Sequence, residues 1–282
     1  MARQTEELPV AQNSGSREIL DDIYLIQECN PKAPLQEQYT ETQPDWYVQG
    51  QEVHMKQNAY LITGAEKTLL WDTTSPANKD GLLEEVERVL DGRDLDYLVP
   101  SHPEAPHAGN SFALLDIHPE AEFIVPDYET SHDLYMMEDA TKVTPGDELD
   151  LGGYTFEIVD PVFVDHKVHM WAREQTTNTL FTVDWLGMVH MDTECLKCVD
   201  ELEQPVTVHR LAEFHSRALF WLEYANVAAI DDAIDRTLSE YDPDVIAPGH
   251  GCPVREEPER YMNLMKDVVR HISDAGKTTE AW

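Results

Sequence analysis

A loop rich in metal-binding side chains, residues 101–110, follows an apolar run at residues 95–100 that we interpret as a buried strand. The residues after the loop resemble the start of a helix. Strand-to-helix loops in α/β proteins hold side chains outside the carboxyl ends of the strands, where binding sites are commonly built. This loop offers two imidazoles and a carboxylate, from His102, Glu104 and His107. It therefore indicates an α/β fold, and for the loop taken alone it leaves two alternatives open, a metal site or an acidic surface loop with incidental histidines.

Three more metal-binding side chains follow short apolar runs that we interpret as strands, namely His166, Asp184 and His250. Any one of these histidines alone would more often be a surface or capping residue. Strand ends meet at one edge of a sheet, so these side chains and those of the 101–110 loop are expected to converge. The sequence therefore predicts a metal site with nitrogen and oxygen ligands.

The order of predicted elements points to a layered α/β architecture. Strands and helices mix in both halves of the chain, which favours two packed sheets with helices outside, a four-layer αβ/βα sandwich. We expect residues 1–18 to form a flexible acidic N-terminal segment. Residues 19–282 should form a single domain, because a chain of this length can bury one sizeable core.

The charge balance excludes several classes of partner. The chain has 55 acidic and 20 basic residues and a formal net charge of -35. Nucleic acids and anionic membranes would both repel it. We find no apolar run long enough to span a membrane and no hydrophobic signal region at the N-terminus, so we expect a cytoplasmic protein. The scattered acidic residues favour a halophilic source, with an ordinary acidic cytosolic protein as the alternative.

Four cysteines occur in the chain, at positions 29, 195, 198 and 252, too few for a disulfide framework in a chain this long. Cys195 and Cys198 have the spacing of a redox or metal-binding pair. No second pair of that spacing completes a four-sulfur site, so the pair alone is weak evidence for either role.

Several motifs together resemble the metallo-β-lactamase superfamily, and most closely the di-iron domain of the flavodiiron proteins. The resemblance runs from about Tyr60 to Tyr261. Its motifs are the Asn58-Ala-Tyr-Leu-Ile and Leu69-Leu-Trp-Asp72 runs, the H-x-E-x-x-H loop, the hairpin at 146–153, Leu180-Phe-Thr-Val-Asp184-Trp-Leu-Gly187, Tyr224-Ala-Asn226 and Ile246-Ala-Pro-Gly-His-Gly251. It implies the metallo-β-lactamase fold, which is a four-layer αβ/βα sandwich. Together with the acidic composition, it suggests a haloarchaeal form of the protein.

The resemblance also implies a ligand set for two divalent metals. It assigns His102, Glu104 and His166 to the first metal, His107 and His250 to the second, and Asp184 to the bridge between them. Glutamate at position 104 is typical of the flavodiiron group, whereas most hydrolases of the superfamily have histidine there. Because a carboxylate suits iron better than zinc, we expect iron, with zinc or manganese as alternatives.

Two positions depart from the family pattern. Pro106 occupies the place of an aspartate ligand, so the second metal loses a donor and is weakly held, absent, or rescued by water or Asp165. His169 competes with His166 for one ligand place; we favour His166, which lies 18 residues before Asp184, and assign His169 a role beside the metal. Asp184 and His169 are therefore our candidate catalytic residues.

The resemblance leaves three functions open. The first is a non-haem di-iron protein that binds or reduces dioxygen or nitric oxide; without a flavodoxin-like domain or a flavin site of its own, it would take electrons from a separate flavoprotein or rubredoxin-like donor. The second is a hydrolase of a small-molecule substrate that uses a metal-activated water. The third is a non-catalytic metal-binding sensor. By analogy with the family, a homodimer is expected.

Overall fold

The computed structural model describes residues 14–129 and 131–276, and its larger sheet begins with four antiparallel strands. β4, β5, β6 and β7 then pair in parallel, and β12 pairs with the first residues of β3. The strands of this sheet are β1 (Ser14–Leu20), β2 (Ile23–Pro31), β3 (Val53–Thr63), β4 (Thr68–Trp71), β5 (Tyr97–Val99), β6 (Glu122–Pro126), β7 (Thr141–Val143) and β12 (Val189–Met191).

The smaller sheet is antiparallel except at one edge, where β13 and β11 run in parallel. Its strands, in spatial order, are β13 (Val245–Pro248), β11 (Thr179–Val183), β10 (Trp171–Glu174), β9 (Thr155–Val159) and β8 (Glu148–Asp150). The pairing of β13 with β11 sets two strand ends side by side, so the residues that follow them, near positions 184 and 250, lie close together.

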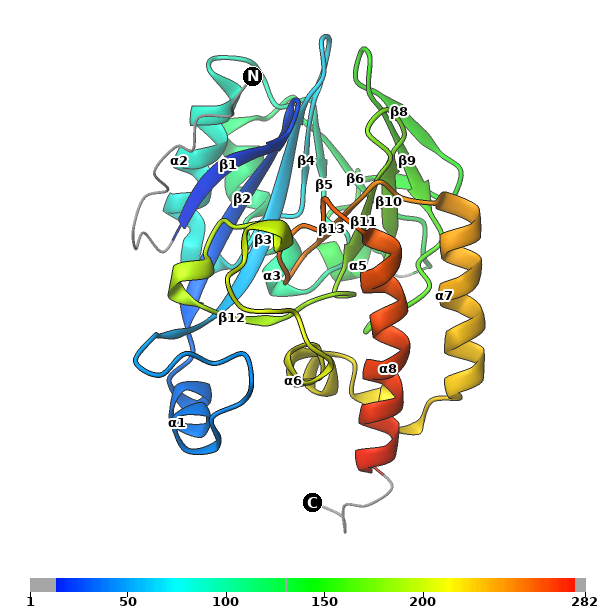
Figure 1. The fold of residues 1–282 in the computed structure, drawn as a ribbon. Helices are drawn as coiled ribbons and strands as arrows, with labels where there is room; N and C mark the ends of the chain where they lie inside the picture. Colours follow the sequence, from blue (N-terminus) through cyan, green and yellow to red (C-terminus); the bar gives the residue numbers. More distant parts are fainter. Residues whose placement is uncertain (1–13, 130, 277–282) are drawn as a thin grey trace, which may run out of the picture.

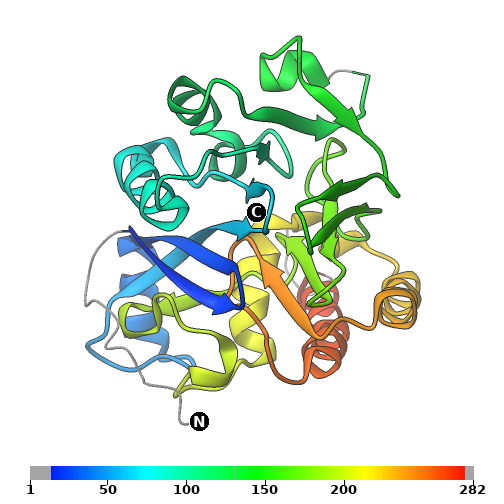
Figure 2. The same ribbon diagram turned by 90° about the horizontal axis from the view of Figure 1, so that it is seen from above.

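Helices flank the two sheets (Figure 1). Helices α7 and α8 lie side by side (Figure 2). Helix α2 lies against the face of the larger sheet that is turned away from the smaller sheet. The helical segments are α1 (Ala33–Thr42), η1 (Pro76–Asn78), α2 (Lys79–Leu90), α3 (Ala105–Ala108), α4 (Ser111–Ile117), α5 (Ser131–Tyr135), η2 (Asp192–Glu194), η3 (Val199–Glu201), α6 (Val208–Ala218), η4 (Phe220–Tyr224), α7 (Val227–Tyr241) and α8 (Pro258–Gly276).

Alternation along the strands explains the layers. On β3, Tyr60 and Ile62 face a core shared with the second sheet, whereas Leu61 faces a separate core under α2. A strand with side chains on both faces buried must be covered on both sides, which is why the sequence reads as continuous apolar runs. The result confirms the predicted four-layer α/β arrangement.

Two local expectations differ from the structure. Residues 162–164 form no strand; they lie in the irregular connection between β9 and β10. Residues 14–18, which we assigned to a flexible terminal segment, pair with β2 as part of β1. The rest of that segment, residues 1–13, lies outside the described residues. Among the described helices, none is both long and apolar enough to cross a membrane.

Candidate metal centre

The centre is built where strands end and the backbone turns sharply. Asp72 follows β4 with a φ of 64°, and Val183 ends β11 with a φ of 53°. A β-branched residue with positive φ is a true conformational outlier, and such outliers cluster at functional sites. The pairing of β11 with β13 shifts in register just before Val183, and Gly249 N donates a hydrogen bond to Val183 O at 2.5 Å. This turn directs the next residue, Asp184, into the centre.

One group of possible ligands contains His102, Asp165, His169 and Asp184. His102 Nε2 lies 3.6 Å from Asp165 Oδ2 and 3.9 Å from Asp184 Oδ2. The imidazoles of His102 and His169 stack with ring centroids 4.6 Å apart, and His169 Nδ1 lies 3.2 Å from Asp165 Oδ1. Two imidazoles and two carboxylates therefore share one small volume.

A second group contains His107, Asp184 and His250. His107 Nε2 and His250 Nε2 are 3.1 Å apart, and they lie 3.8 and 3.3 Å from Asp184 Oδ1. Asp184 thus presents Oδ2 to the first group and Oδ1 to the second. A carboxylate placed in this way can bridge two ions.

Unpaired polar atoms in the first group fit a cation. His102 Nε2, His169 Nε2 and Asp184 Oδ2 are buried and have no hydrogen-bond partner. Buried polar atoms are nearly always paired in native proteins, because leaving one unpaired costs about 1–3 kcal/mol. Three such atoms directed to one place are what a metal would satisfy, and nitrogen and oxygen donors suit iron, zinc or manganese.

The outer nitrogens of the second group are fixed by the protein. His107 Nδ1 lies 2.8 Å from Asp72 Oδ2, and His250 Nδ1 donates to Lys56 O at 2.9 Å. Asp72 Oδ1 also accepts a hydrogen bond from Ser101 N at 2.7 Å, so this carboxylate joins the end of β4 to the metal-binding loop. Such contacts leave Nε2 free to bind a metal and orient the ring.

The electrostatics of the centre favour ionised carboxylates. Burial raises the pKa of Asp184, but the histidines around it, His250 first, outweigh burial and bring the pKa below its usual range. Burial and the nearby His107 lower the pKa of His102 to about 4. Burial also opposes protonation of His107, yet the charge and hydrogen bond of Asp72 raise its pKa to about 9. The first group therefore holds the neutral imidazole of His102 next to the anionic carboxylate of Asp184, the forms that bind metals.

The structure brings together most of the residues proposed from sequence. His102, His107, Asp184 and His250 converge, and His169 joins them in the place that we assigned to His166. His166 lies outside both groups, with its Nδ1 accepting a hydrogen bond from Val168 N at 3.1 Å. The missing strand at 162–164 explains the difference, since spacing cannot tell which of two nearby histidines an irregular loop turns inward.

The positions of two acidic residues, Glu104 and Asp165, differ from those that the sequence predicted. Glu104 is 54% exposed, and its Oε2 lies 3.9 Å from His102 Nε2, outside the clustered ligands. Asp165, which we considered as a replacement donor for the second metal, lies with His102 and His169 instead. Pro106 sits in the first turn of α3 and brings no donor. The sequence signal for Asp165 was its position four residues before His169, which alone is not specific.

Comparisons with known proteins give a family match and several relatives. A model of the metallo-beta-lactamase superfamily matches residues 54–177. A nitric oxide reductase of Moorella thermoacetica is 25% identical over 224 residues, covering 78% of this chain and 54% of the relative. An anaerobic nitric oxide reductase flavorubredoxin of Vibrio vulnificus is 26% identical over 257 residues, covering 83% and 50%. The chain therefore spans about half the length of the curated relatives that it matches.

Solved structures share the fold. A mutant of the flavo di-iron protein from Thermotoga maritima superposes with a TM-score of 0.71 at 20% identity, covering 91% of this chain and 62% of that one. The rubredoxin oxygen:oxidoreductase of Desulfovibrio gigas gives a TM-score of 0.65 at 21% identity, covering 95% and 63%. At this level of identity the likeness establishes the fold.

Proposed function

Because the chain carries a metallo-β-lactamase superfamily domain with flavodiiron proteins among its relatives, we propose that it is a non-haem di-iron protein that binds or reduces dioxygen or nitric oxide. The observation that carries the proposal is the position of Asp184, whose two oxygens face two separate ligand groups. Electrons would come from a separate donor, a flavoprotein or a rubredoxin-like protein. The substrate would be a diatomic gas.

Each of the two proposed ions has its own set of ligands, and Asp184 belongs to both sets. We assign the first ion to His102, Asp165, His169 and Asp184, with Glu104 as a donor that can turn inward from the surface. The second ion takes His107, His250 and the shared Asp184. When bound, the two ions would supply the electrons and the open positions at which a diatomic binds.

The surrounding residues fix these donors and limit water. Asp72 and the carbonyl of Lys56 hold the two imidazoles of the second group in their metal-binding orientation. The ring of Phe214 lies against His250, with centroids 5.3 Å apart, and Gly187 leaves the space for it, since a Cβ there would come within 2.3 Å of that ring. The apolar ring shields one side of the second group.

A specific observation also favours a hydrolase as the second candidate. With Pro106 in place of a carboxylate, the second group offers two imidazoles and one carboxylate. Three protein ligands with an open position are typical of catalytic zinc, where the ion lowers the pKa of bound water to about 7. A domain that holds zinc here would act on an ester or thioester.

Metal analysis and gas consumption distinguish the two functions. We expect protein purified without oxygen to hold iron tightly in the first group and substoichiometrically in the second, because the second group has fewer carboxylates. Pro106→Asp should raise the iron content and increase oxygen or nitric oxide uptake with an added reductase and rubredoxin. Zinc-loaded protein that hydrolyses esters without gas uptake would instead support the hydrolase. Wild-type protein with two tightly bound irons would show that another donor replaces the missing aspartate.

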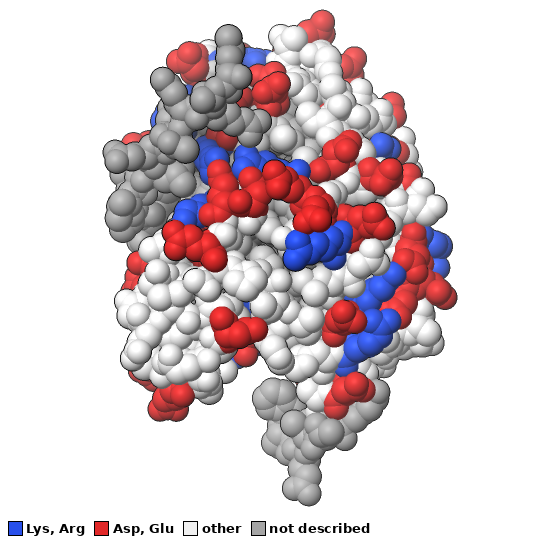
Figure 3. All heavy atoms as spheres, in the orientation of Figure 1, with Lys and Arg blue, Asp and Glu red and all other residues white. Residues whose placement is uncertain are grey.

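We also infer that the protein works at high salt inside the cell. On the face drawn in Figure 3 basic side chains lie beside acidic ones. The ion pairs Lys266–Asp235 and Arg270–Asp231 join α8 to α7. With a net charge of -35, self-repulsion remains large until salt screens it. A melting temperature that rises from dilute buffer to molar potassium chloride would support this inference, and a flat one would contradict it. A homodimer remains a proposal by analogy with the family.

A further inference from the structure

A separate cluster of four metal-binding side chains lies on the larger sheet, and we propose that it binds a structural zinc ion. Its members are Cys29, His54, His190 and Cys195, and one ligand atom from each lies within 4.8 Å of the others. None of these residues belongs to the centre around Asp184. The proposal is independent of the function proposed above.

Strand pairing brings three of the four side chains to one face of the sheet. His190 of β12 pairs directly with His54 of β3, and Cys29 of β2 pairs with Lys56, two residues along β3 from His54. Directly paired residues share a face, as do residues two apart on a strand. The fourth member, Cys195, comes from the turn that follows η2.

The distances match a tetrahedral zinc site. Cys29 Sγ and Cys195 Sγ both lie 3.5 Å from His190 Nε2, and Cys195 Sγ lies 3.6 Å from His54 Nδ1. For zinc bonds of about 2.3 Å to sulfur and about 2.0–2.1 Å to nitrogen, tetrahedral angles separate a sulfur from a nitrogen by about 3.6 Å. The three sulfur–nitrogen contacts are therefore at the spacing that a shared ion would impose.

Hydrogen bonding alone satisfies this cluster poorly. Cys195 Sγ faces both His190 Nε2 and His54 Nδ1, although a thiol has a single proton to donate. His190 is fully buried, and its Nε2 in turn faces both Cys29 Sγ and Cys195 Sγ. Cys29 Sγ donates to Gln27 Oε1 at 3.0 Å, and it would lose this proton on binding a metal. An ion that accepts a lone pair from each of the four atoms resolves the competition.

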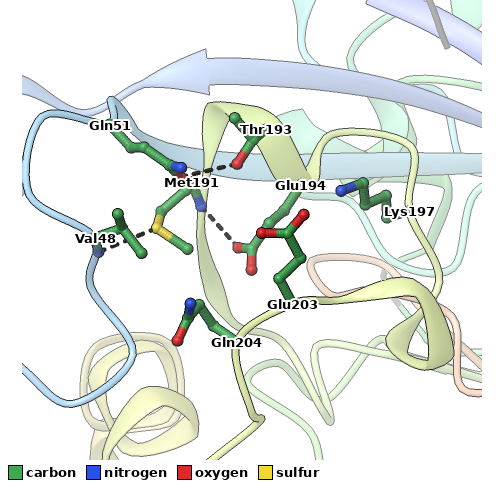
Figure 4. Close-up of a pocket in the computed structure, with 8 residues that line it drawn as sticks. All are labelled: Val48, Gln51, Met191, Thr193, Glu194, Lys197, Glu203 and Gln204. Carbon is green, nitrogen blue, oxygen red and sulfur yellow. Dashed lines mark hydrogen bonds between the residues drawn. The ribbon is translucent and has the colours of Figure 1, made fainter. Parts of the chain in front are cut away.

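Contacts around the cluster hold the ligands in place. His54 Nε2 lies 2.9 Å from Glu52 Oε2, a carboxylate–histidine contact that leaves Nδ1 for a metal. The turn from β12 to Cys195 is fixed by hydrogen bonds from Met191 N to Glu194 Oε2 at 2.9 Å and from Thr193 Oγ1 to Gln51 at 2.8 Å, which are drawn in Figure 4. These hydrogen bonds position Cys195 beside the three strand residues.

The donor set selects the metal and its role. Two sulfurs and two imidazole nitrogens in tetrahedral positions are typical of zinc, and four protein ligands leave no open position. Such a site stabilises rather than catalyses. The ion would join β2, β3 and β12 to the turn that follows η2. This junction lies at the first residues of β3, the strand that contacts α1.

Cobalt provides a probe that sees this site alone. Because the centre around Asp184 has only nitrogen and oxygen donors, a thiolate-to-cobalt charge-transfer absorption can come only from a cysteine site. We expect Co²⁺ added to the reduced, metal-free full chain to produce this absorption and the intense visible bands of tetrahedral cobalt, and Zn²⁺ to abolish both. Cys29→Ser and Cys195→Ser should each weaken the charge-transfer band, because each removes one of the two thiolates, and the double variant should lose it, whereas Cys198→Ser should keep it at full strength.

A second measurement uses the wild-type protein, so it does not depend on whether the cysteine variants fold. In the wild-type protein, Zn²⁺ should protect Cys29 and Cys195 from alkylation by at least ~10-fold in rate, the lower range of effects on metal sites, and a chelator should remove the protection. Folded, reduced wild-type protein that gives no charge-transfer band with Co²⁺ would overturn the proposal. So would a band that Cys198→Ser abolishes and Cys29→Ser keeps at full strength, or a Cys29–Cys195 disulfide in protein that binds no metal after reduction.

Discussion

The two candidate metal-binding regions are connected by one face of β3 but are built in different ways. The centre around Asp184 lies where strands end, and positive φ angles at Asp72 and Val183 turn its ligands inward. The cysteine–histidine cluster takes three ligands from regular strand pairing. Backbone strain of this kind clusters at functional sites, whereas four protein ligands leave a zinc ion no open position. The first arrangement suits chemistry and the second suits stability.

Alternate residues of β3 link the two regions. His54 belongs to the cysteine–histidine cluster. The carbonyl of Lys56 orients His250, and its Nζ donates to Glu194 O and Cys252 Sγ at 2.9 and 2.8 Å. Asn58 donates to the carbonyls of Pro248 and Gly251 on either side of His250, at 2.7 and 2.8 Å. An ion that fixes one end of β3 would therefore also support the imidazole of the second metal group.

The largest effect that separates the regions should come from Asp184→Asn. The substitution removes the anionic bridge from both groups of the centre but touches nothing in the cluster. We expect gas consumption to fall more than ~100-fold, since even outer contacts of metal ligands are worth ~10–100-fold. The thiolate–cobalt absorption should not change, and absorption spectra of cobalt-loaded protein would check it. Loss of that absorption in folded Asp184→Asn protein would show that the two regions are not independent.

A smaller loss of iron affinity should show which of two histidines, His169 or His166, is a ligand of the first group. His169→Ala removes a buried imidazole from the first group, so we expect iron affinity at that group to fall by ~10–100-fold or more. His166→Ala is the matched control, because it removes the same side chain from the same loop but from outside both ligand groups, and it should change affinity less than ~2-fold on that scale. Competition with a chromogenic chelator measures both. If His166→Ala lowered the iron affinity more than His169→Ala, the ligand would be His166, as the spacing in the sequence predicted.

The strand ends were predictable because the apolar runs before them are buried on both faces. Thr179–Val183 and Val245–Pro248 appear in the sequence as short hydrophobic segments, and the polar residues that follow had to meet at a sheet edge. The inward turn of His169 was not predictable, since the loop before β10 has no periodicity. The cysteine–histidine cluster was missed because sequence proximity pointed to Cys195 and Cys198. Instead, Cys198 packs in the main apolar core, and the partners of Cys195 come from β2, β3 and β12.

The smallest effects should come from the carboxylates behind the ligands, and the two regions should differ there too. Asp72 is buried beside His107, whereas Glu52 beside His54 is 57% exposed. Asp72→Asn should weaken the second iron by ~10–100-fold, the usual effect of such a contact. Glu52→Gln should weaken zinc by less than ~10-fold, because water screens an exposed charge and the amide oxygen can still accept the His54 proton.

Zinc and iron competition assays on the two variants measure this difference directly. Each variant should leave the metal affinity of the other region unchanged, which provides an internal control. If Glu52→Gln cost as much zinc affinity as Cys29→Ser, Glu52 would be a ligand and the site would not be a closed Cys₂His₂ site. If Asp72→Asn had no effect on iron, the position of His107 would be set by the packing of α3 rather than by its contact with Asp72.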